Sequence, residues 1–307
     1  LHYLTRTLRR DASHLRSLKA YRQADHLLLD ASTQGHLELV VSRAGRGMTL
    51  LGTLDRTVTP MGARTLRDWI LHPLIDPSAI TARQDALGLL IASPLKLGDL
   101  REKLGGVRDI ERSVSRLSQN SGNARDLAVL AASLGAVPEI GKIVSGCGGD
   151  LLAGLAGRLH PLLEITSLLA AALVEEPPAT IREGGMIKAG FDDSLDELRS
   201  ASTEGKAWIA ALQEKEIQRT GIKSLKVRFN AVFGYFIEVT TANLGSVPDD
   251  YTRKQTTAGG ERFITPELKE MEAKILGSEE RSKALEIEIF QRLRAAVLEQ
   301  VLPLQET

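Results

Sequence analysis

Apolar residues in the first half of the chain recur at three- and four-residue steps, the spacing of one face of a helix. Thr59-Pro60 has the pattern of a helix N-cap followed by proline at the first helical position. His72-Pro73 ends this helix, because proline disfavours helical backbone in the residue before it. Further helices are predicted over 77–93, 124–134 and 151–174. Residues 21–54 contain Leu27, Leu28 and Leu29 and then Leu37, Leu39 and Val41, which could form short strands or turns, and both remain open there.

Two longer apolar patterns in the second half predict helices well above the usual globular length. One runs from Asp192 to about Arg219, and the other runs from Pro266, capped by Thr265, to about Leu302. At about 1.5 Å per residue, the second helix would be on the order of 50 Å long. Helices of this length are typical of a stalk or lever.

Between these helices apolar and polar residues alternate, which is the pattern of half-buried strands. In residues 225–230 the polar positions are Lys226, Arg228 and Asn230, so two cations and an amide share one strand face. After a turn near Gly234, a second strand completes a hairpin with Phe236, Glu238 and Thr240 on the outer side. The inward positions are Leu225, Val227, Phe229, Tyr235, Ile237 and Val239.

A third, polar strand is predicted over 251–257, and a bend at Gly259-Gly260 leads into Phe263-Ile264. Together these strands form a small sheet over about 220–264, inserted between the two long helices. The predicted fold class is therefore mainly α with a small β insertion.

Overall composition gives no reason to expect a strong attraction to nucleic acid. Lys and Arg together number 39, as do Asp and Glu, and aromatic residues make up only 4%, which disfavours a base-stacking platform. Charge is nevertheless segregated: residues 206–265 hold nine basic and six acidic residues, and residues 266–307 hold six and nine. Any nucleic-acid contact is therefore expected to be local and close to the sheet.

Catalytic and metal-binding patterns are missing from the sequence. Gly135 to Lys142 comes nearest to a nucleotide-binding loop, but its spacing is wrong and Ile143 follows the lysine, so a helix-terminal turn is the better interpretation. The six histidines are scattered, and the lone Cys147 excludes an internal disulfide. We predict no catalytic residue, no metal site and no cofactor in this chain.

The surroundings of the chain are predicted from the same sequence. No apolar run approaches the roughly 20 residues that span a bilayer, and no signal-peptide pattern is present, so we expect a cytoplasmic protein without membrane contact. Because the chain starts without Met and stops within a polar segment, we expect it to be part of a longer polypeptide. The basic strand face has two interpretations at this point: an ordinary solvated surface, or a surface that binds phosphates.

Long stretches of the chain resemble the MutS family of bacterial DNA mismatch-repair proteins. The resemblance is carried by residues 216–227, by NAVFGYFIEV at 230–239, by DYTRKQT at 250–256 and by ERFITPEL at 261–268. Upstream, LDRTVTPMGAR at 54–64, PLID at 73–76 and DIER at 109–112 resemble the core of the same family. The similarity extends over almost the whole chain.

The resemblance implies a helical core and a long-helix lever that carries an inserted β-rich clamp. The implied domains are the end of a connector at 1–25, the helical core and first part of the lever at 26–205, the clamp at 206–265 and the returning lever helix at 266–307. In such a protein the clamp holds duplex DNA through phosphates without reading bases. The residues implied in this contact are Lys226, Arg228, Asn230, Arg253, Lys254, Gln255, Thr256, Gly259 and Arg262. The chain departs from many relatives at Ala258-Gly259, where a Lys-Asn pair would supply a cation and a side-chain donor.

The resemblance also implies a function for the parent protein: DNA mismatch repair, in which an ATPase absent from these residues opens and closes the clamp. ATP and Mg²⁺ would belong to that parent, and its partners would be double-stranded DNA, a second protomer and MutL, in a cytoplasmic, nucleoid-associated setting. The chain itself is not expected to be an enzyme. The alternative from a different class is a structural helical arm or partner-docking module without DNA affinity.

Overall fold

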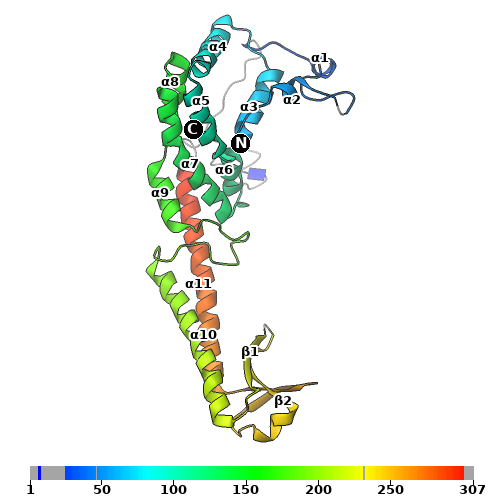
Figure 1. Cartoon of the computed structure of the whole chain (residues 1–307), viewed down its shortest axis with the longest axis vertical. Coiled ribbons are helices and arrows are strands. Elements are labelled where there is room, and N and C mark those ends of the chain that lie inside the picture. The colour runs from blue at the N-terminus through cyan, green and yellow to red at the C-terminus, as the bar shows by residue number, and fades with distance from the viewer. Residues whose placement is uncertain (1–5, 8–24, 46, 231, 301–307) are drawn as a thin grey trace. The chain divides into compact units, whose positions relative to one another are not determined.

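The computed structural model describes residues 6–7, 25–45, 47–230 and 232–300 (Figure 1). They form two compact units, one of the described residues up to 181 and from 290 onward, and one of the described residues between 182 and 289. The first is helical and the second combines long helices with the sheet, so the predicted mainly α class with a small β insertion is confirmed. The four-part domain division stays a prediction, and its first segment lies largely outside the described residues.

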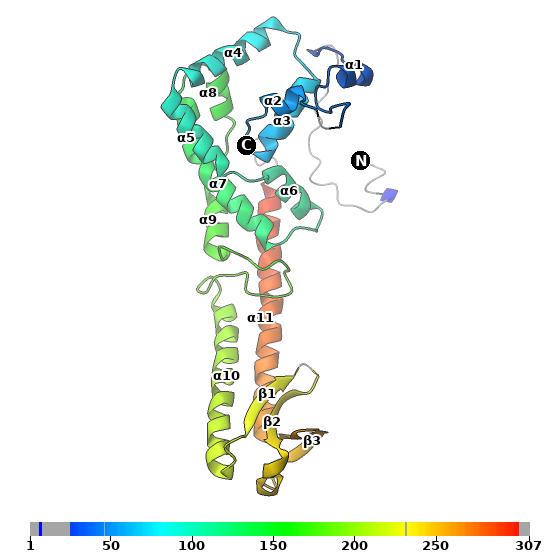
Figure 2. The same ribbon diagram turned by 45° about the vertical axis from the view of Figure 1, so that its right-hand side comes forward.

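The first unit is helical, and four of its helices pack against one long helix, α7. Its helices are α1 (Ala31–His36), α2 (Leu50–Leu54), α3 (Pro60–Leu71), α4 (Pro77–Ile91), α5 (Pro94–Gly105), α6 (Ile110–Ser118), α7 (Ala124–Ser145), α8 (Asp150–Ala156) and α9 (Leu163–Ala172). α7 contacts α5, α6, α8 and α9, as Figure 2 shows. Leu127, Leu130 and Leu134 of α7 are fully buried, so this helix supplies the centre of the core.

Helix starts in this unit follow the capping signals. Thr59 accepts a hydrogen bond from the Gly62 backbone at the start of α3, and Asp76 does the same for Ser78 at the start of α4. Both predicted helices are confirmed. In the region left open, 21–54, the described residues form the short helices α1 and α2 rather than strands.

Two other helix predictions were wrong in their extent. α7 continues beyond Leu134 to Ser145 and passes through Pro138, because buried Val137, Ile140 and Val144 continue its apolar face. The predicted helix 151–174 is instead α8 and α9, since Pro161 interrupts the helical backbone between them. α5 and α6 were not predicted.

α7 also corrects the prediction that no apolar run approaches the length of a membrane span. Within the described part of the chain, it is the one helix whose length and composition would allow it to cross a bilayer. Its leucines are buried against the neighbouring helices of the first unit. Packing within the unit thus accounts for its apolar character.

The second unit contains α10 (Asp193–Thr220) and most of α11 (Pro266–Glu299), with the sheet between them in sequence. Asp192 caps α10 by accepting from the Leu195 backbone, and Gly221 ends it in the left-handed conformation that suits glycine, with φ of 72°. Both long helices are confirmed, although the predicted end of α11 at Leu302 lies outside the described residues. Gly205 lets α10 approach α11 closely, because a Cβ at this position would collide with Ile275.

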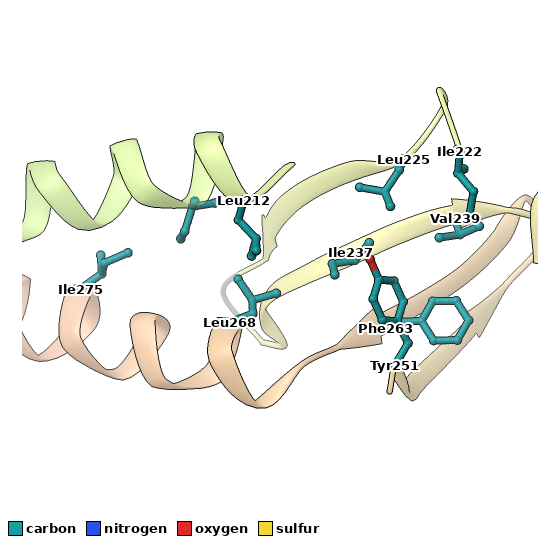
Figure 3. Close-up of a cluster of buried hydrophobic side chains, with 10 residues drawn as sticks. Leu212, Ile222, Leu225, Ile237, Val239, Tyr251, Phe263, Leu268 and Ile275 are labelled. Atoms are coloured by element: carbon teal, nitrogen blue, oxygen red, sulfur yellow. The ribbon is translucent and has the colours of Figure 1, made fainter. Parts of the chain in front are cut away.

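Four antiparallel strands form the sheet in the order β1-β2-β4-β3. Their bounds are β1 (Lys226–Asn230), β2 (Gly234–Thr240), β3 (Thr252–Thr257) and β4 (Gly260–Ile264), and the 3-10 helix η3 (Thr241–Ser246) follows β2. One face packs on the ends of the long helices through a buried cluster that includes Leu212, Ile237, Phe263 and Leu268 (Figure 3). We call this surface the apolar face.

A buried carboxylate organises the start of the second unit. Glu286 of α11 is only 2% exposed and accepts hydrogen bonds from the backbone amides of Gly185 and Met186 at 2.9 and 2.7 Å. Arg199 of α10 donates to the same carboxylate at 2.9 Å. One side chain therefore joins both long helices to the loop that precedes α10. With the longer contact from the Ile187 backbone amide, four donors surround the buried carboxylate and compensate for its burial.

Candidate nucleic-acid interface

Strand register places five of the residues predicted to contact DNA on one face of the sheet. Lys226 lies opposite Glu238, Glu238 lies opposite Arg262, and Arg262 lies opposite Gln255. Because side chains alternate between the two faces of a strand, those of Arg228 and Asn230 project from the same face of β1 as that of Lys226. We call this surface the charged face. Its members are Lys226, Arg228, Asn230, Phe236, Glu238, Gln255 and Arg262.

Glu238 is the acidic centre of the charged face. Its carboxylate lies 3.2 Å from Nε of Arg228 on one side and 3.9 Å from Nε of Arg262 on the other. The Arg228 side chain is 53% exposed, so water screens this pair and its contribution to stability is expected to be small, about 0–1 kcal/mol. The carboxylate nevertheless offsets part of the positive charge on this face.

Arg262 is held on several sides. Its Nη1 donates to Oε1 of Gln255 at 2.8 Å, and its guanidinium carbon lies 4.4 Å from the ring centroid of Phe236. Its Nε is buried and has no hydrogen-bond partner among the described residues. Phe236 lies on the outer side of the hairpin, as predicted, but it is only 2% exposed, because Arg262 stacks on its ring on the charged face.

Lys226 is the most available cation on the charged face. Its side chain is exposed, and it makes no hydrogen bond or ion pair with any residue that the structure describes. Asn230 accepts a hydrogen bond from the Val232 backbone at 2.8 Å, which leaves its amide nitrogen as a potential donor. Lys254 is tied down, since its ammonium donates to the Phe233 carbonyl at 2.7 Å.

Other predicted residues are not brought onto the charged face. Arg253 lies opposite Phe263 and pairs with Glu261 at 3.1 Å, on the side of the sheet that carries the apolar face. Thr256 lies opposite Glu261, so its side chain projects from that same side of the sheet. A register shift between Arg253 and Gln255 makes Lys254 the extra residue of a bulge. Gly259 is exposed in the turn between β3 and β4.

The inward alternation predicted for β1 holds only in part. Leu225 is buried and Val227 is half-buried, but Phe229 is 51% exposed. Its ring lies 5.0 Å from that of Tyr235, on the strand that pairs with β1. The expectation of a buried Phe229 was therefore wrong, because this end of the hairpin extends beyond the buried cluster.

A buried network fixes the sheet to α10. The Tyr251 hydroxyl donates to Glu216 at 2.8 Å, and Arg219 donates to Glu216 and also to Asp250. Burial, and then the bond to the Glu216 carboxylate, raise the pKa of Tyr251 well above its ordinary value. The start of β3 is thus tied to the last turns of α10, which limits how the sheet can move against the helix.

Clusters with the composition of a metal site are missing from the described residues, where no group of three or more His, Cys, Asp or Glu side chains comes together. The predicted helix-terminal turn at Gly135 to Lys142 was wrong, because these residues lie inside α7. A regular helix leaves the backbone amides of this segment bonded within the helix, so they do not form a phosphate loop.

Sequence reasoning missed the role of Glu238 in this site. The signal that points to it is the hairpin register: a turn centred between Asn230 and Gly234 sets Lys226 opposite Glu238. Alternation alone placed this carboxylate on the outer face. It did not show that two arginines, from β1 and β4, meet there.

Comparison with known proteins gives one family. The model described as MutS domain III matches residues 32–307. The DNA mismatch repair protein MutS of Halothermothrix orenii is 45% identical over 100% of this chain and 34% of its own length. The proteins of the same name from Methanosarcina mazei and Geobacillus thermodenitrificans are 47% and 48% identical, over 100% and 99% of this chain. The chain spans about a third of the length of these relatives.

Proposed function

The chain belongs to the MutS domain III family, and from that premise we propose that the charged face of its sheet holds duplex DNA by the phosphate backbone during mismatch repair. The observation that carries the proposal is the row of Lys226, Arg228 and Arg262 on one sheet face, with Gln255 beside it. Cations and amide donors in such a row suit a line of phosphates. Contacts to phosphates carry no direct sequence information.

Binding of this kind gains free energy mainly by releasing counterions from DNA. It is therefore independent of sequence and falls steeply with salt. The small number of exposed cations on this face predicts a weak hold by one copy of the chain. The departure at Ala258-Gly259 lowers it further, because Gly259 offers only a backbone amide at that turn.

The rest of the proposal concerns the longer protein. We propose that ATP and Mg²⁺ act outside these residues, and that α10 and α11 serve as a lever that transmits their effect to the sheet, which serves as the clamp. A second protomer and MutL are proposed as partners, and the proposed location is cytoplasmic and nucleoid-associated. This chain would then be a mechanical and DNA-holding part of the protein, without catalysis of its own.

The test is a salt titration of homoduplex binding by the 307-residue chain beside its Lys226→Glu, Arg228→Glu variant. We expect the double variant to bind at least roughly tenfold more weakly at low salt, with a salt slope that is smaller by roughly 0.9 for each phosphate that the variant no longer neutralises. Fluorescence anisotropy of a labelled duplex measures both quantities.

A matched control reverses two exposed cations of α11 that lie outside the sheet, in the Arg281→Glu, Lys283→Glu variant. It changes the net charge equally and should lower affinity far less. Equal weakening in both variants would contradict a contact on the charged face, and it would indicate a general effect of charge.

One observation favours a second function, that of a structural arm without DNA affinity. Arg228, Arg253 and Arg262 lie beside Glu238 or Glu261, as expected for a solvated network of ion pairs on a structural arm. On that interpretation neither double variant changes DNA affinity. Undetectable binding by the unchanged chain at low salt would favour it.

A further inference from the structure

We infer that Glu238 is an internal counter-charge that competes with DNA phosphate for Arg228, and so weakens the hold of the sheet on DNA. The inference rests on the proposed function and adds a way in which the strength of this DNA binding is regulated. Of the two acidic residues in the four strands, Glu238 lies on the charged face and Glu261 on the opposite side. A single carboxylate therefore stands among the cations proposed to meet phosphates.

The geometry gives this carboxylate three cationic neighbours from two strands. Lys226 is its partner in the register of β1, Arg228 lies 3.2 Å away, and Arg262 lies 3.9 Å away on β4. A carboxylate and a phosphate oxygen accept hydrogen bonds from a guanidinium in the same way. Glu238 thus occupies, for Arg228, the place of the anion that the charged face is proposed to bind.

Arg262 shows that the internal pairing is incomplete. Its Nε is a buried donor without a hydrogen-bond partner among the described residues, because the nearest Glu238 oxygen is beyond hydrogen-bonding distance. Arg228 is half exposed and held by this one described carboxylate, so a phosphate can reach it by displacing Glu238. Displacement leaves the carboxylate close to the bound phosphate, where like charges repel.

The consequence is a hold on DNA that is weaker than the number of cations suggests. An attached duplex must break the Arg228–Glu238 pair, and release of the duplex restores it. Such a competitor shortens the lifetime of each phosphate contact, which favours movement of the sheet along the backbone over a fixed grip.

The experiment measures homoduplex affinity and its salt slope for the full chain and for Glu238→Gln, which keeps the size of the side chain. We expect Glu238→Gln to bind roughly three- to tenfold more tightly at low salt. The salt slope should be steeper by roughly 0.9 for each arginine freed to meet a phosphate. Glu270→Gln, which removes the same charge from an exposed position on α11, should leave both quantities nearly unchanged.

Repeating the change in an Arg228→Ala background identifies the cation involved. The gain in affinity should shrink there, because the freed guanidinium is gone. Equal or weaker binding by Glu238→Gln while the unchanged chain binds DNA would overturn the inference alone. Absence of binding by every variant at low salt would overturn the proposed function and the inference with it.

Discussion

The two faces of the small sheet are held by different kinds of interaction. The apolar face packs Ile237 and Phe263 into a cluster with α10 and α11, and both side chains are almost completely buried. The charged face holds Arg228, Glu238 and Arg262 in contacts that water partly screens. Adjacent residues such as Ile237 and Glu238 therefore have separate tasks, since one stabilises the fold and the other sets the charge that a ligand meets.

Because the two faces alternate along each strand, we expect that changes at successive residues affect stability and DNA affinity separately. A change on the apolar face acts first on folding, because it removes buried contacts or leaves a cavity. A change on the charged face acts first on electrostatics, because the pairs there are worth little to stability. Each of the following changes tests this separation.

The largest effect is expected from Ile237→Ala. Ile237 is 0% exposed, and its truncation should lower the free energy of unfolding by about 2–5 kcal/mol. Urea unfolding followed by the fluorescence of Trp208, which packs against this cluster, measures the decrease in a Trp69→Phe background. The neighbouring Glu238→Gln should change stability by less than about 1 kcal/mol. Similar decreases in both variants would mean that the two faces are not independent.

The buried network below the sheet should give the next effect. Tyr251→Phe removes a hydrogen bond to the Glu216 carboxylate and should cost about 1.5–3 kcal/mol. The raised pKa of Tyr251 also predicts a pH dependence. The stability that the Tyr251 proton contributes is complete below the ordinary tyrosine pKa of about 10. It disappears as pH rises above that value, because the unfolded chain releases the proton first.

The measurement is the unfolding free energy of both proteins between about pH 8 and 11.5, a range that brackets the ordinary tyrosine pKa. Stability of the unchanged chain should fall more steeply above about pH 10 than that of Tyr251→Phe. Tyr235 and Lys206, whose pKa values are also raised, are present in both proteins, so the difference isolates Tyr251. Parallel curves would contradict a proton held by Tyr251 in the folded state.

Much of this architecture could be predicted from the sequence because its signals are local. Asp192 and Gly221 bound α10, and Pro60 and Pro77 begin two helices of the first unit, through bonds that reach only a few residues. The continuation of α7 through Pro138 was not predictable in this way. It depends on burial against four other helices, which overrides the cost of a proline.

The candidate site could likewise be predicted only where its signals are local. Alternation placed Lys226, Arg228 and Asn230 on one strand face, since strand geometry has a period of two. The position of Arg253 on the opposite side follows from pairing with β4 and from the bulge, which no local pattern reports. The burial of Phe236 under Arg262 joins residues from different strands and needed the folded sheet.

Arg262 lies on the charged face but is expected to contribute to the stability of the fold as well. Its guanidinium stacks on buried Phe236, so Arg262→Ala should expose that ring and destabilise the fold by about 1–2 kcal/mol. Arg262→Met keeps an apolar cover and should recover part of this stability while still weakening DNA binding. Arg228→Ala changes a side chain that is 53% exposed and pairs with Glu238, so it should cost about 0–1 kcal/mol. Denaturant unfolding of the three variants ranks them, and equal destabilisation would contradict a covering role.

The smallest expected effect compares the two acidic residues of the sheet. Glu261→Gln removes the same charge as Glu238→Gln, but from the side on which Glu261 pairs with Arg253. If only the charged face meets DNA, its affinity should change by less than about twofold, because the removed charge is farther from phosphate and screened by water. Anisotropy of a labelled duplex at low salt measures this directly. A gain equal to that of Glu238→Gln would instead place Arg253 in contact with DNA, and the duplex would then reach the edge formed by β3 as well as the face formed by β1 and β2.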